Sequence, residues 1–432
     1  MQILVIGQAS THWGRKEFGN IGNYYVAQSF FRELNRVFPG AVIHTTQQLT
    51  DEFCKREHVT CVPMELFYGW NENDVPMAYK ELALAEIYHE TGNLVEVTPY
   101  IEEVLAADLV IDFSGDMWGD NAELAGKNRF LVGLLKVRSA QLLGKKTAMI
   151  CGSPGPFETC KDLLPLAIKV YNSLDLVTNR EPESKKVLEQ YGFETSKVHD
   201  LACPAFLFES AEDADVTNAI KGTVLENKMR PVVGFMLCGW NMLQGPFSRT
   251  DWRDEEYKNF MDVICYMARK YDVDFCLMSH SNGFKLPPNF ELIHGRDYQL
   301  TKQLYDLVKQ TDVASHVHIL DGIYLPKVTF GIVKKFDMLI SGRVHGAIAG
   351  IAQAVPTTII DYGHEPKAHK LKGFATLLNM QHLVSDPHFS DDMINKASFC
   401  WENREKIHAE LCERLPQVRD MARKNFDLLK AL

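Results

Sequence analysis

An arginine and a histidine that could bind an anion and move a proton lie two positions apart in this chain. Arg343 and His345 follow an apolar run, 338–340, that predicts a buried strand. A guanidinium can hold a phosphate or carboxylate through two parallel hydrogen bonds. An imidazole titrates near neutral pH, so it can give or take a proton. The pair indicates an anion site, although a surface ion pair and a helix cap would explain the two residues equally well.

The surrounding segment, Asp337 to Phe374, predicts a strand–helix–strand unit. Small residues with helical spacing, 347–354, follow the histidine, and a second apolar run, 357–361, ends at Tyr362. The arginine and histidine therefore fall at the carboxyl end of the first strand. In open α/β sheets ligands bind at that edge, and a helix starting there offers free N–H groups and a positive dipole end.

Asp116, Arg180 and His280 each follow a further predicted strand, so we expect them at the same kind of edge. Each also has an ordinary explanation. The aspartate could cap a helix, the arginine could form a salt bridge beside neighbouring glutamates, and the histidine could make a hydrogen bond within its loop.

Composition limits the classes of function. The chain has 432 residues and a formal net charge of −10, which argues against nucleic-acid binding by phosphate neutralisation. Its 10 cysteines contain no C-x-x-C pair, and we interpret them as reduced core residues of a cytoplasmic protein. No cluster has metal-ligand spacing, no apolar run reaches the roughly 18 residues of a membrane helix, and no signal peptide is recognisable. The dinucleotide and Walker A fingerprints are absent, so NAD and ATP are set aside.

Strand–helix alternation runs to about residue 208 and starts again at Pro231. We therefore predict an α/β protein with two Rossmann-like domains, residues 1–210 and 228–395, facing a central cleft in a GT-B-type architecture. A C-terminal helix, about 410–432, is expected to break at Pro416 and to pack on the first domain.

The same residues resemble the polysaccharide pyruvyl transferase family. Its C-terminal signature reads Arg-Leu-His, then Val-Pro, then a Tyr and a Lys-x-x-Gly. Here Val344 replaces the Leu, and an insertion after the tyrosine leaves both Lys367 and Lys370 as candidates for the matching lysine. We prefer Lys370 because of the residues after it. The corresponding segments are Arg343-Val-His345, Val355-Pro356, Tyr362 and Lys370-x-x-Gly373-Phe374.

Further segments match the family with departures. Asn20-Ile-Gly22-Asn23 corresponds to the family's Asn-(Ile/Leu)-Gly-Asp, with Asn23 in place of the Asp. Asp116 stands where the family has the second Gly of a Gly-Gly pair, and Cys203 stands where it has an Asp. Arg180 falls at the position of an essential arginine of the family.

The resemblance implies transfer of a pyruvyl group from phosphoenolpyruvate to a sugar of a polysaccharide precursor, forming a ketal. It implies that Arg343 and Lys370 hold the donor anions, that Arg180 stabilises or protonates the enolpyruvyl group, and that His345 protonates or holds the leaving phosphate. A guanidinium is a poor general acid, so we expect electrostatic stabilisation from the Arg180 side chain. No metal or cofactor is expected. The remaining expected substrate contacts are Asn20, Gly22, Asn23, Asp116, His280 and Tyr362.

Two alternatives stay open. One is a GT-B glycosyltransferase that uses a nucleotide sugar, whose diphosphate would bind the same helix N-termini. The other is a divergent, non-catalytic sugar-binding protein, because Asn23, Asp116 and Cys203 depart from the family pattern. Peripheral contact with a lipid-linked acceptor, and assembly into a homo-oligomer, are also left open.

Overall fold

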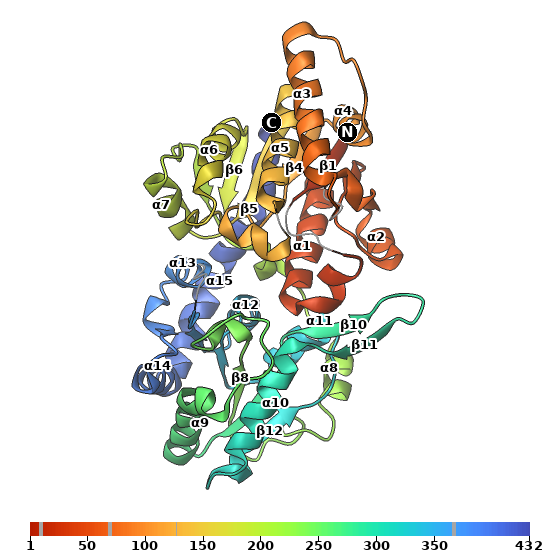
Figure 1. Cartoon of the computed structure of the whole chain (residues 1–432). Coiled ribbons are helices and arrows are strands. Elements are labelled where there is room, and N and C mark those ends of the chain that lie inside the picture. Colours follow the sequence, from red (N-terminus) through yellow and green to blue (C-terminus); the bar gives the residue numbers. More distant parts are fainter. Residues whose placement is uncertain (8–11, 68–70, 127, 365–368) are drawn as a thin grey trace. The chain divides into compact units, whose positions relative to one another are not determined.

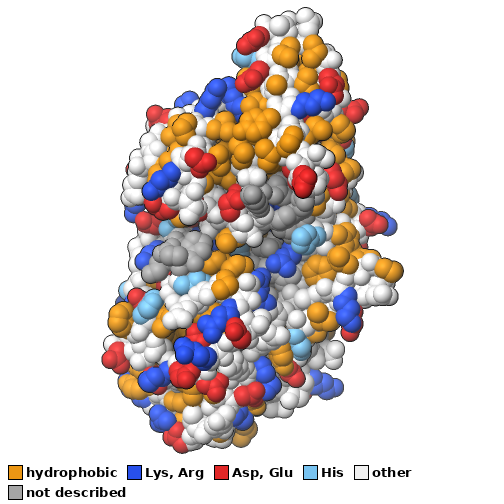
Figure 2. All heavy atoms as spheres, viewed as in Figure 1, with side chains coloured by type: hydrophobic (Ala, Val, Ile, Leu, Met, Phe, Trp, Pro, Cys, Tyr) orange, Lys and Arg blue, Asp and Glu red, His pale blue; other side chains and the backbone are white. Residues whose placement is uncertain are grey.

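The computed structural model describes residues 1–7, 12–67, 71–126, 128–364 and 369–432 (Figure 1). On the face shown in Figure 2, acidic and basic side chains are interspersed. Within these described ranges, no helix is both long and apolar enough to cross a membrane.

The described residues pack into two compact units. The division between them falls inside two helices, α1 (Ile21–Val37) and α15 (Arg404–Asp427), so each unit is built from separate stretches of chain. Our predicted domain bounds stay a prediction. Unit 1 comprises Met1–Arg15, Gln28–Pro204 and Asp420–Leu432, and unit 2 comprises Lys16–Ala27 and Ala205–Arg419.

Unit 1 contains a seven-stranded parallel sheet in the order β3-β2-β1-β4-β5-β6-β7. Parallel neighbours require crossover connections, and most of these contain helices. The order turns back between β1 and β4, which creates the switch point where ligands bind in such sheets. The strands of unit 1 are β1 (Gln2–Ile6), β2 (Val42–Thr45), β3 (Thr60–Cys61), β4 (Leu109–Asp112), β5 (Lys146–Gly152), β6 (Leu176–Asn179) and β7 (Val198–Asp200). Its helices, besides parts of α1 and α15, are α2 (Asp51–Glu57), α3 (Asp74–Thr91), α4 (Pro99–Ala106), α5 (Arg129–Leu142), α6 (Leu164–Asn172) and α7 (Glu183–Gln190).

Unit 2 contains a six-stranded parallel sheet in the order β12-β9-β8-β13-β14-β15, with its own switch point between β8 and β13. An antiparallel hairpin, β10 with β11, is inserted after β9. The strands of unit 2 are β8 (Val232–Met236), β9 (Asp274–Met278), β10 (Asn282–Lys285), β11 (Glu291–His294), β12 (Val317–Leu320), β13 (Met338–Ser341), β14 (Thr357–Ile360) and β15 (Val384–Ser385). Its helices, besides parts of α1 and α15, are α8 (Asp213–Ala219), α9 (Lys258–Tyr271), α10 (Arg296–Val308), α11 (Pro326–Val333), α12 (Val344–Ile351), α13 (Lys370–Leu377) and α14 (Ser390–Glu402).

The helical spacing of apolar residues in α9 matches the face of that helix that is buried. Phe260, Val263, Ile264 and Met267 stand at positions i, i+3, i+4 and i+7 of one helix face and are fully or almost fully buried. The helix ends at Asp272 in the left-handed conformation, and that cap N–H bonds back to a carbonyl of the last turn.

The predicted break of the C-terminal helix at Pro416 is wrong, because α15 continues through it. A proline inside a helix removes one backbone hydrogen bond. Burial of Leu411, Leu415 and Val418 on either side of the proline offsets that loss and keeps the helix intact. Within unit 1, Asn425 near the end of α15 accepts a hydrogen bond from Thr178 at 2.6 Å.

All ten cysteines are free thiols, but not all of them are core residues. Cys412 is exposed, and Cys54 and Cys61 are half-buried with their sulfurs 3.4 Å apart. The Cys61 thiol donates to the carbonyl of Gln47 at 3.1 Å, which ties β3 to the loop after β2. Sequence composition alone had assigned these three thiols to the core.

A buried ion pair joins α3 to α5 in unit 1. The ammonium of Lys136 contacts the carboxylate of Glu81, and both side chains are at most 3% exposed. Burial raises the pKa of Glu81 and lowers that of Lys136, although each charge favours the other. Further hydrogen bonds come from Thr98 to the carboxylate and from the ammonium to the carbonyl of Leu66. Both charged groups therefore have hydrogen-bond partners, and removing either one would destabilise the folded protein.

We predict that Lys136→Met lowers the free energy of unfolding by about 3–5 kcal/mol, because it leaves the Glu81 carboxylate buried and unpaired. The double variant Glu81→Leu/Lys136→Met should recover most of this loss. Lys80→Met is the control, since Lys80 of α3 forms a solvent-exposed ion pair with Glu96, and its loss should cost under about 1 kcal/mol. Urea unfolding measures all three, and equal losses in Lys136→Met and Lys80→Met would contradict the prediction.

Candidate functional site

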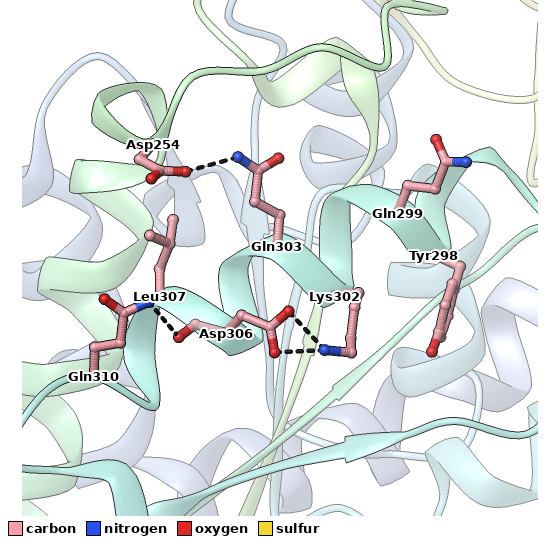
Figure 3. Close-up of a pocket in the computed structure, with 8 residues that line it drawn as sticks. All are labelled: Asp254, Tyr298, Gln299, Lys302, Gln303, Asp306, Leu307 and Gln310. Atoms are coloured by element: carbon pink, nitrogen blue, oxygen red, sulfur yellow. Dashed lines mark hydrogen bonds and ion pairs between the residues drawn. The ribbon is translucent and has the colours of Figure 1, made fainter.

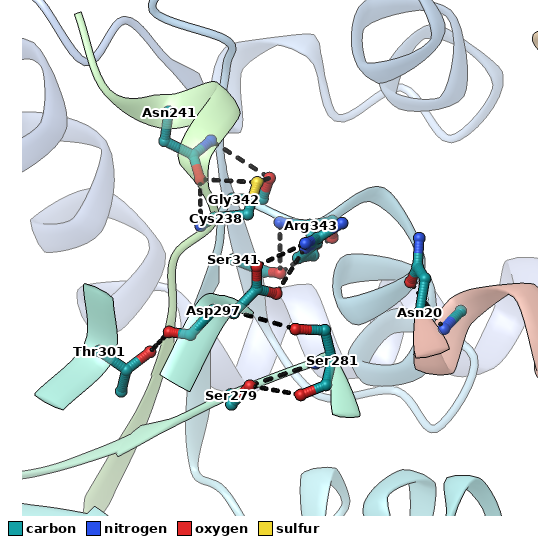
Figure 4. Close-up of polar contacts among 11 residues, drawn as sticks. Asn20, Cys238, Asn241, Ser279, Ser281, Asp297, Thr301, Ser341, Gly342 and Arg343 are labelled. Atoms are coloured by element: carbon teal, nitrogen blue, oxygen red, sulfur yellow. Dashed lines mark hydrogen bonds and ion pairs between the residues drawn. The ribbon is translucent and has the colours of Figure 1, made fainter. Parts of the chain in front are cut away.

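Four loops of unit 2 leave the carboxyl edges of β9, β8, β13 and β14, which are neighbours in the sheet. The segments that follow these strands carry five of the residues predicted from the sequence, His280, Arg343, His345, Tyr362 and Lys370. Figure 4 shows the polar contacts around one of them, Arg343. This is the edge where open α/β sheets bind ligands.

Arg343 lies at this edge and is held by a buried carboxylate. Its Nε donates to Oδ2 of Asp297 at 2.8 Å and its Nη2 to Oδ1 at 2.5 Å, in a two-point pair (Figure 4). The Asp297 side chain is fully buried and that of Arg343 is 14% exposed. Burial lowers the pKa of the Arg343 guanidinium, but the Asp297 charge raises it more, so the group stays ionised. The remaining nitrogen, Nη1, makes no hydrogen bond within the part of the chain that the structure describes.

Asn241 ties three of the four loops together. Its amide nitrogen lies 3.2 Å from each of the carbonyls of Gly342, Ile360 and Asp361, and its oxygen accepts from the backbone N–H of Cys238 at 2.9 Å. A side chain at position 342 would collide with this amide, because a Cβ there would lie 2.0 Å from the Asn241 oxygen. The glycine before Arg343 is therefore required for this close approach.

The Asn20–Gly22 motif lies against His345 within unit 2. Asn20 forms an isolated antiparallel bridge with Ser281, and its side chain accepts from the N–H of Gly22 at 3.1 Å. A Cβ on Gly22 would lie 2.4 Å from the Cβ of His345, so only glycine permits this contact. His345 is in the first turn of α12, as predicted, with Arg343 as the N-cap residue. Two helix N-termini, those of α1 and α12, thus meet at the histidine.

His280 is also at this edge, but its ring is fully buried. Its Nε2 lies 3.3 Å from the hydroxyl of Tyr25, and its Nδ1 has no hydrogen-bond partner in the described structure. Burial and, secondarily, the charge of Arg343 lower the pKa of His280 to about 3. The side chain is therefore neutral at physiological pH and packs as a core residue.

Tyr362 and Lys370 follow β14. The Lys370 ammonium lies 5.6 Å from the centre of the Tyr362 ring, and that ring stacks on Trp240, with 5.6 Å between ring centres. Lys370 is the first residue of α13. The competing candidate, Lys367, lies outside the described residues.

Arg180 and Asp116 belong to unit 1, at the carboxyl edges of β6 and β4. The Nε of Arg180 donates to the Ser153 hydroxyl at 2.8 Å, and its Nη2 lies 3.5 Å from the Asp116 carboxylate. Burial lowers the pKa of Arg180, but Asp116 and neighbouring groups raise it above its ordinary value. Asp116 therefore faces an arginine, and not a helix N-terminus as its ordinary explanation had it; its role as a substrate contact stays a prediction.

The structure thus gathers Asn20, Gly22, His280, Arg343 and His345 in unit 2, with Asn23 in the first turn of α1, where its N–H donates to the Asn20 carbonyl at 2.9 Å. Sequence reasoning missed Asp297 and gave Asn241 no role. An acidic residue in the first turn of a helix is common and carries no functional signal by itself. Convergence of Arg180 with Arg343 and His345 on one site stays a prediction.

A surface groove lies elsewhere in unit 2, along α10 (Figure 3). It has a volume of about 390 Å³ and is lined by residues that bond to one another, such as Lys302 with Asp306 and Gln303 with Asp254. None of the predicted site residues lines it. Among described residues, no group of three or more His, Cys, Asp or Glu could hold a metal ion.

We predict that Gly22→Ala destabilises the protein by about 1–3 kcal/mol, because the new methyl group overlaps His345. In open space the same change inside a helix would stabilise by up to about 1 kcal/mol, so the sign of the effect is diagnostic. Gly152→Ala is the control, since a Cβ there meets its neighbours at 3.4 Å, an ordinary contact. Urea unfolding measures both variants, and a stabilised Gly22→Ala protein would contradict the contact.

The low pKa of His280 predicts a pH effect with a defined sign. The folded state disfavours protonation of His280, so the neutral imidazole contributes to the free energy of unfolding. This contribution is fully present above the pKa of the unfolded state, near 6.5, and is lost as pH falls toward the folded-state pKa of about 3. Between pH 7 and pH 5 the loss from this residue is about 2 kcal/mol. His280→Gln should lose less stability over the same interval than the parent protein. Urea unfolding at the two pH values tests this, and equal losses would contradict it.

The profile of the polysaccharide pyruvyl transferase family matches residues 20–364. No curated protein matches the chain. Among solved structures, HepE of Anabaena in complex with UDP is similar at 12% identity and a TM-score of 0.59, with 100% of both chains covered.

Two other solved structures are similar over nearly their whole length. A glycosyltransferase of Rickettsia africae matches at 13% identity and a TM-score of 0.56, with 100% of this chain and 98% of that chain covered. UDP-GlcNAc 2-epimerase of Neisseria meningitidis bound to UDP-GlcNAc matches at 11% identity and a TM-score of 0.51, with both chains fully covered. At these identities the likeness shows the fold alone, and it confirms the predicted GT-B-type fold. With its family profile matched over most of its length, the chain belongs to the polysaccharide pyruvyl transferase family.

Proposed function

We propose that this protein transfers a pyruvyl group from phosphoenolpyruvate to a pair of hydroxyls on a sugar of a glycan precursor. Family membership supports the class of reaction. The observation that carries the proposal is the meeting of Asn20, Gly22 and His345 beside Arg343 at one sheet edge. It brings three of the family's motif residues next to the guanidinium of Arg343.

The donor carries a phosphate and a carboxylate, and unit 2 offers cationic groups for both. The Nη1 of Arg343, which has no hydrogen bond to any described residue, can donate one directed hydrogen bond, and the N–H groups of the first turn of α12 can donate others. Because Asp297 neutralises Arg343, further positive charge must come from another group, and we assign Lys370 to that role. His345, in the same first turn, would meet the phosphate leaving group.

Arg180 would stabilise the enolpyruvyl group from unit 1. Its guanidinium is buried, fixed by Ser153 and Asp116, and permanently charged. A fixed cation in a dry site stabilises developing negative charge without needing to reorganise. A raised pKa makes this group a still poorer proton donor, so its role is electrostatic.

The reaction would proceed by an addition to C2 of phosphoenolpyruvate followed by a substitution at C2. One sugar hydroxyl attacks C2 and loses its proton while C3 takes up a proton, which gives a tetrahedral phosphoketal. A second hydroxyl of the same sugar then attacks C2, and the C–O bond to phosphate breaks. The leaving phosphate takes a proton from His345, and the second hydroxyl loses its proton to solvent or base. The products are a cyclic ketal and inorganic phosphate.

A nucleotide-sugar glycosyltransferase is the second candidate. HepE, which shares the fold, has been seen with UDP and with UDP-glucose. A thermal-shift comparison separates the two, because a ligand raises the melting temperature of the protein that binds it. Stabilisation by phosphoenolpyruvate but not by UDP-glucose favours pyruvyl transfer, the reverse favours glycosyl transfer, and neither favours a non-catalytic role. We further propose a cytoplasmic location, in keeping with ten free thiols.

We predict that His345→Ala lowers the rate of phosphate release by about 10²–10⁴-fold, because a proton donor to the leaving group acts only as the bond breaks. Binding of phosphoenolpyruvate, measured by calorimetry, should change far less. Phosphate release is assayed with phosphoenolpyruvate and a panel of pyranosides carrying free hydroxyl pairs. His388→Ala is the control, since this histidine of unit 2 is 38% exposed and pairs with Asp386. Turnover by His345→Ala at the parent rate would remove the basis for this role.

A further inference from the structure

Asp297 is the residue that no motif predicts and on which Arg343 depends. It is the second residue of α10, its side chain is fully buried, and both carboxylate oxygens face the same guanidinium (Figure 4). Its backbone N–H is bonded to the Ser281 hydroxyl at 3.2 Å, and its carbonyl accepts from Thr301 at 2.7 Å. The backbone of Asp297 is therefore held by contacts that do not involve the arginine.

The start of α10 is positioned by close backbone contact. Gly295 precedes the helix, and a Cβ there would lie 2.4 Å from the carbonyl oxygen of Ser281. The Ser281 residue also bridges to Asn20. The segment that carries the Asn20–Gly22 motif and the carboxylate that holds Arg343 are thus anchored to one residue after β9.

We propose that Asp297 is a positioning residue that orients Arg343, so that only Nη1 is presented to the anion of the substrate. This rests on the proposed donor role of Arg343. An arginine side chain has several rotatable bonds, and a two-point pair removes most of that freedom in advance. The same pair cancels the net charge, so the arginine contributes direction to donor binding and other groups contribute charge.

The chain supplies a matched control at the opposite edge of the same sheet. Asp274, the first residue of β9, is also buried and lies 3.3 Å from the Nη1 of Arg230. Asp297→Asn and Asp274→Asn each replace a buried carboxylate by an amide of nearly equal size beside an arginine. A purely structural role predicts similar effects in the two variants. A positioning role predicts that only Asp297→Asn disturbs the site.

The first test needs no substrate. Phenylglyoxal modifies arginine by bridging two guanidinium nitrogens, and peptide mass spectrometry gives the rate at each arginine. In the parent protein Arg343 should react more slowly than Arg253, whose side chain is 66% exposed. Asp297→Asn should speed the reaction at Arg343 by about tenfold or more, as expected if its pKa falls by at least one unit. Asp274→Asn should leave the rate at Arg343 unchanged.

The second test uses phosphoenolpyruvate and calorimetry. Asp297→Asn should weaken binding by about tenfold or more, and Asp274→Asn should bind like the parent. If the parent binds no phosphoenolpyruvate, the proposed function fails and the phenylglyoxal rates alone decide the role of Asp297. If Asp297→Asn does not fold, the comparison of Arg343 with Arg180 in the parent decides, because the Arg180 side chain is 9% exposed and lies 3.5 Å from its carboxylate partner, so it is similarly buried but held less closely. A rate at Arg343 no lower than that at Arg180 would then overturn the proposal. An Arg343 rate equal to that of Arg253, or unchanged by Asp297→Asn, overturns the proposal.

Discussion

A buried charge must be paired, and the pair of Arg343 with Asp297 is the constraint on which the unit 2 edge depends. Removing either partner would leave an uncompensated ion in a dry environment, at a cost of about 3–5 kcal/mol. The pair joins the N-terminus of α12 to that of α10, two helices that follow different strands. Its geometry therefore sets the distance between the loops after β9 and β13, and with it the space available to a ligand.

Glycines permit the close approaches that this edge requires. Gly22 lies against His345, Gly342 against Asn241 and Gly295 against the backbone of Ser281, each where a Cβ would overlap an atom already present. In a polar site built from loops, backbone groups must come near enough to bond while side chains remain oriented. The small residues are thus part of the site, although they carry no chemistry of their own.

The two units have the same kind of parallel sheet but carry different residues at its edge. Each sheet reverses its strand order once, and each collects polar side chains at the carboxyl edges beside that reversal. In both, the arginine singled out by sequence faces a carboxylate: Asp116 for Arg180 in unit 1, and Asp297 for Arg343 in unit 2. Asp297 is fully buried, so it constrains Arg343 more strongly than the Asp116 side chain, which is 23% exposed, constrains Arg180.

By itself the sequence determined the α/β class, most strands and the positions of Arg343 and His345 at a strand end, because period-2 and period-3.6 patterns are local. It did not reveal that Asp297 meets Arg343 or that His280 is buried, since the partners lie far apart in the chain and no local pattern records which strands become neighbours. It was wrong about Pro416, because burial on both sides of that residue outweighed a local helix-breaking preference. Tertiary structure decided which charges pair and which side chains lose water, and those two facts set what the arginine and the histidine can do.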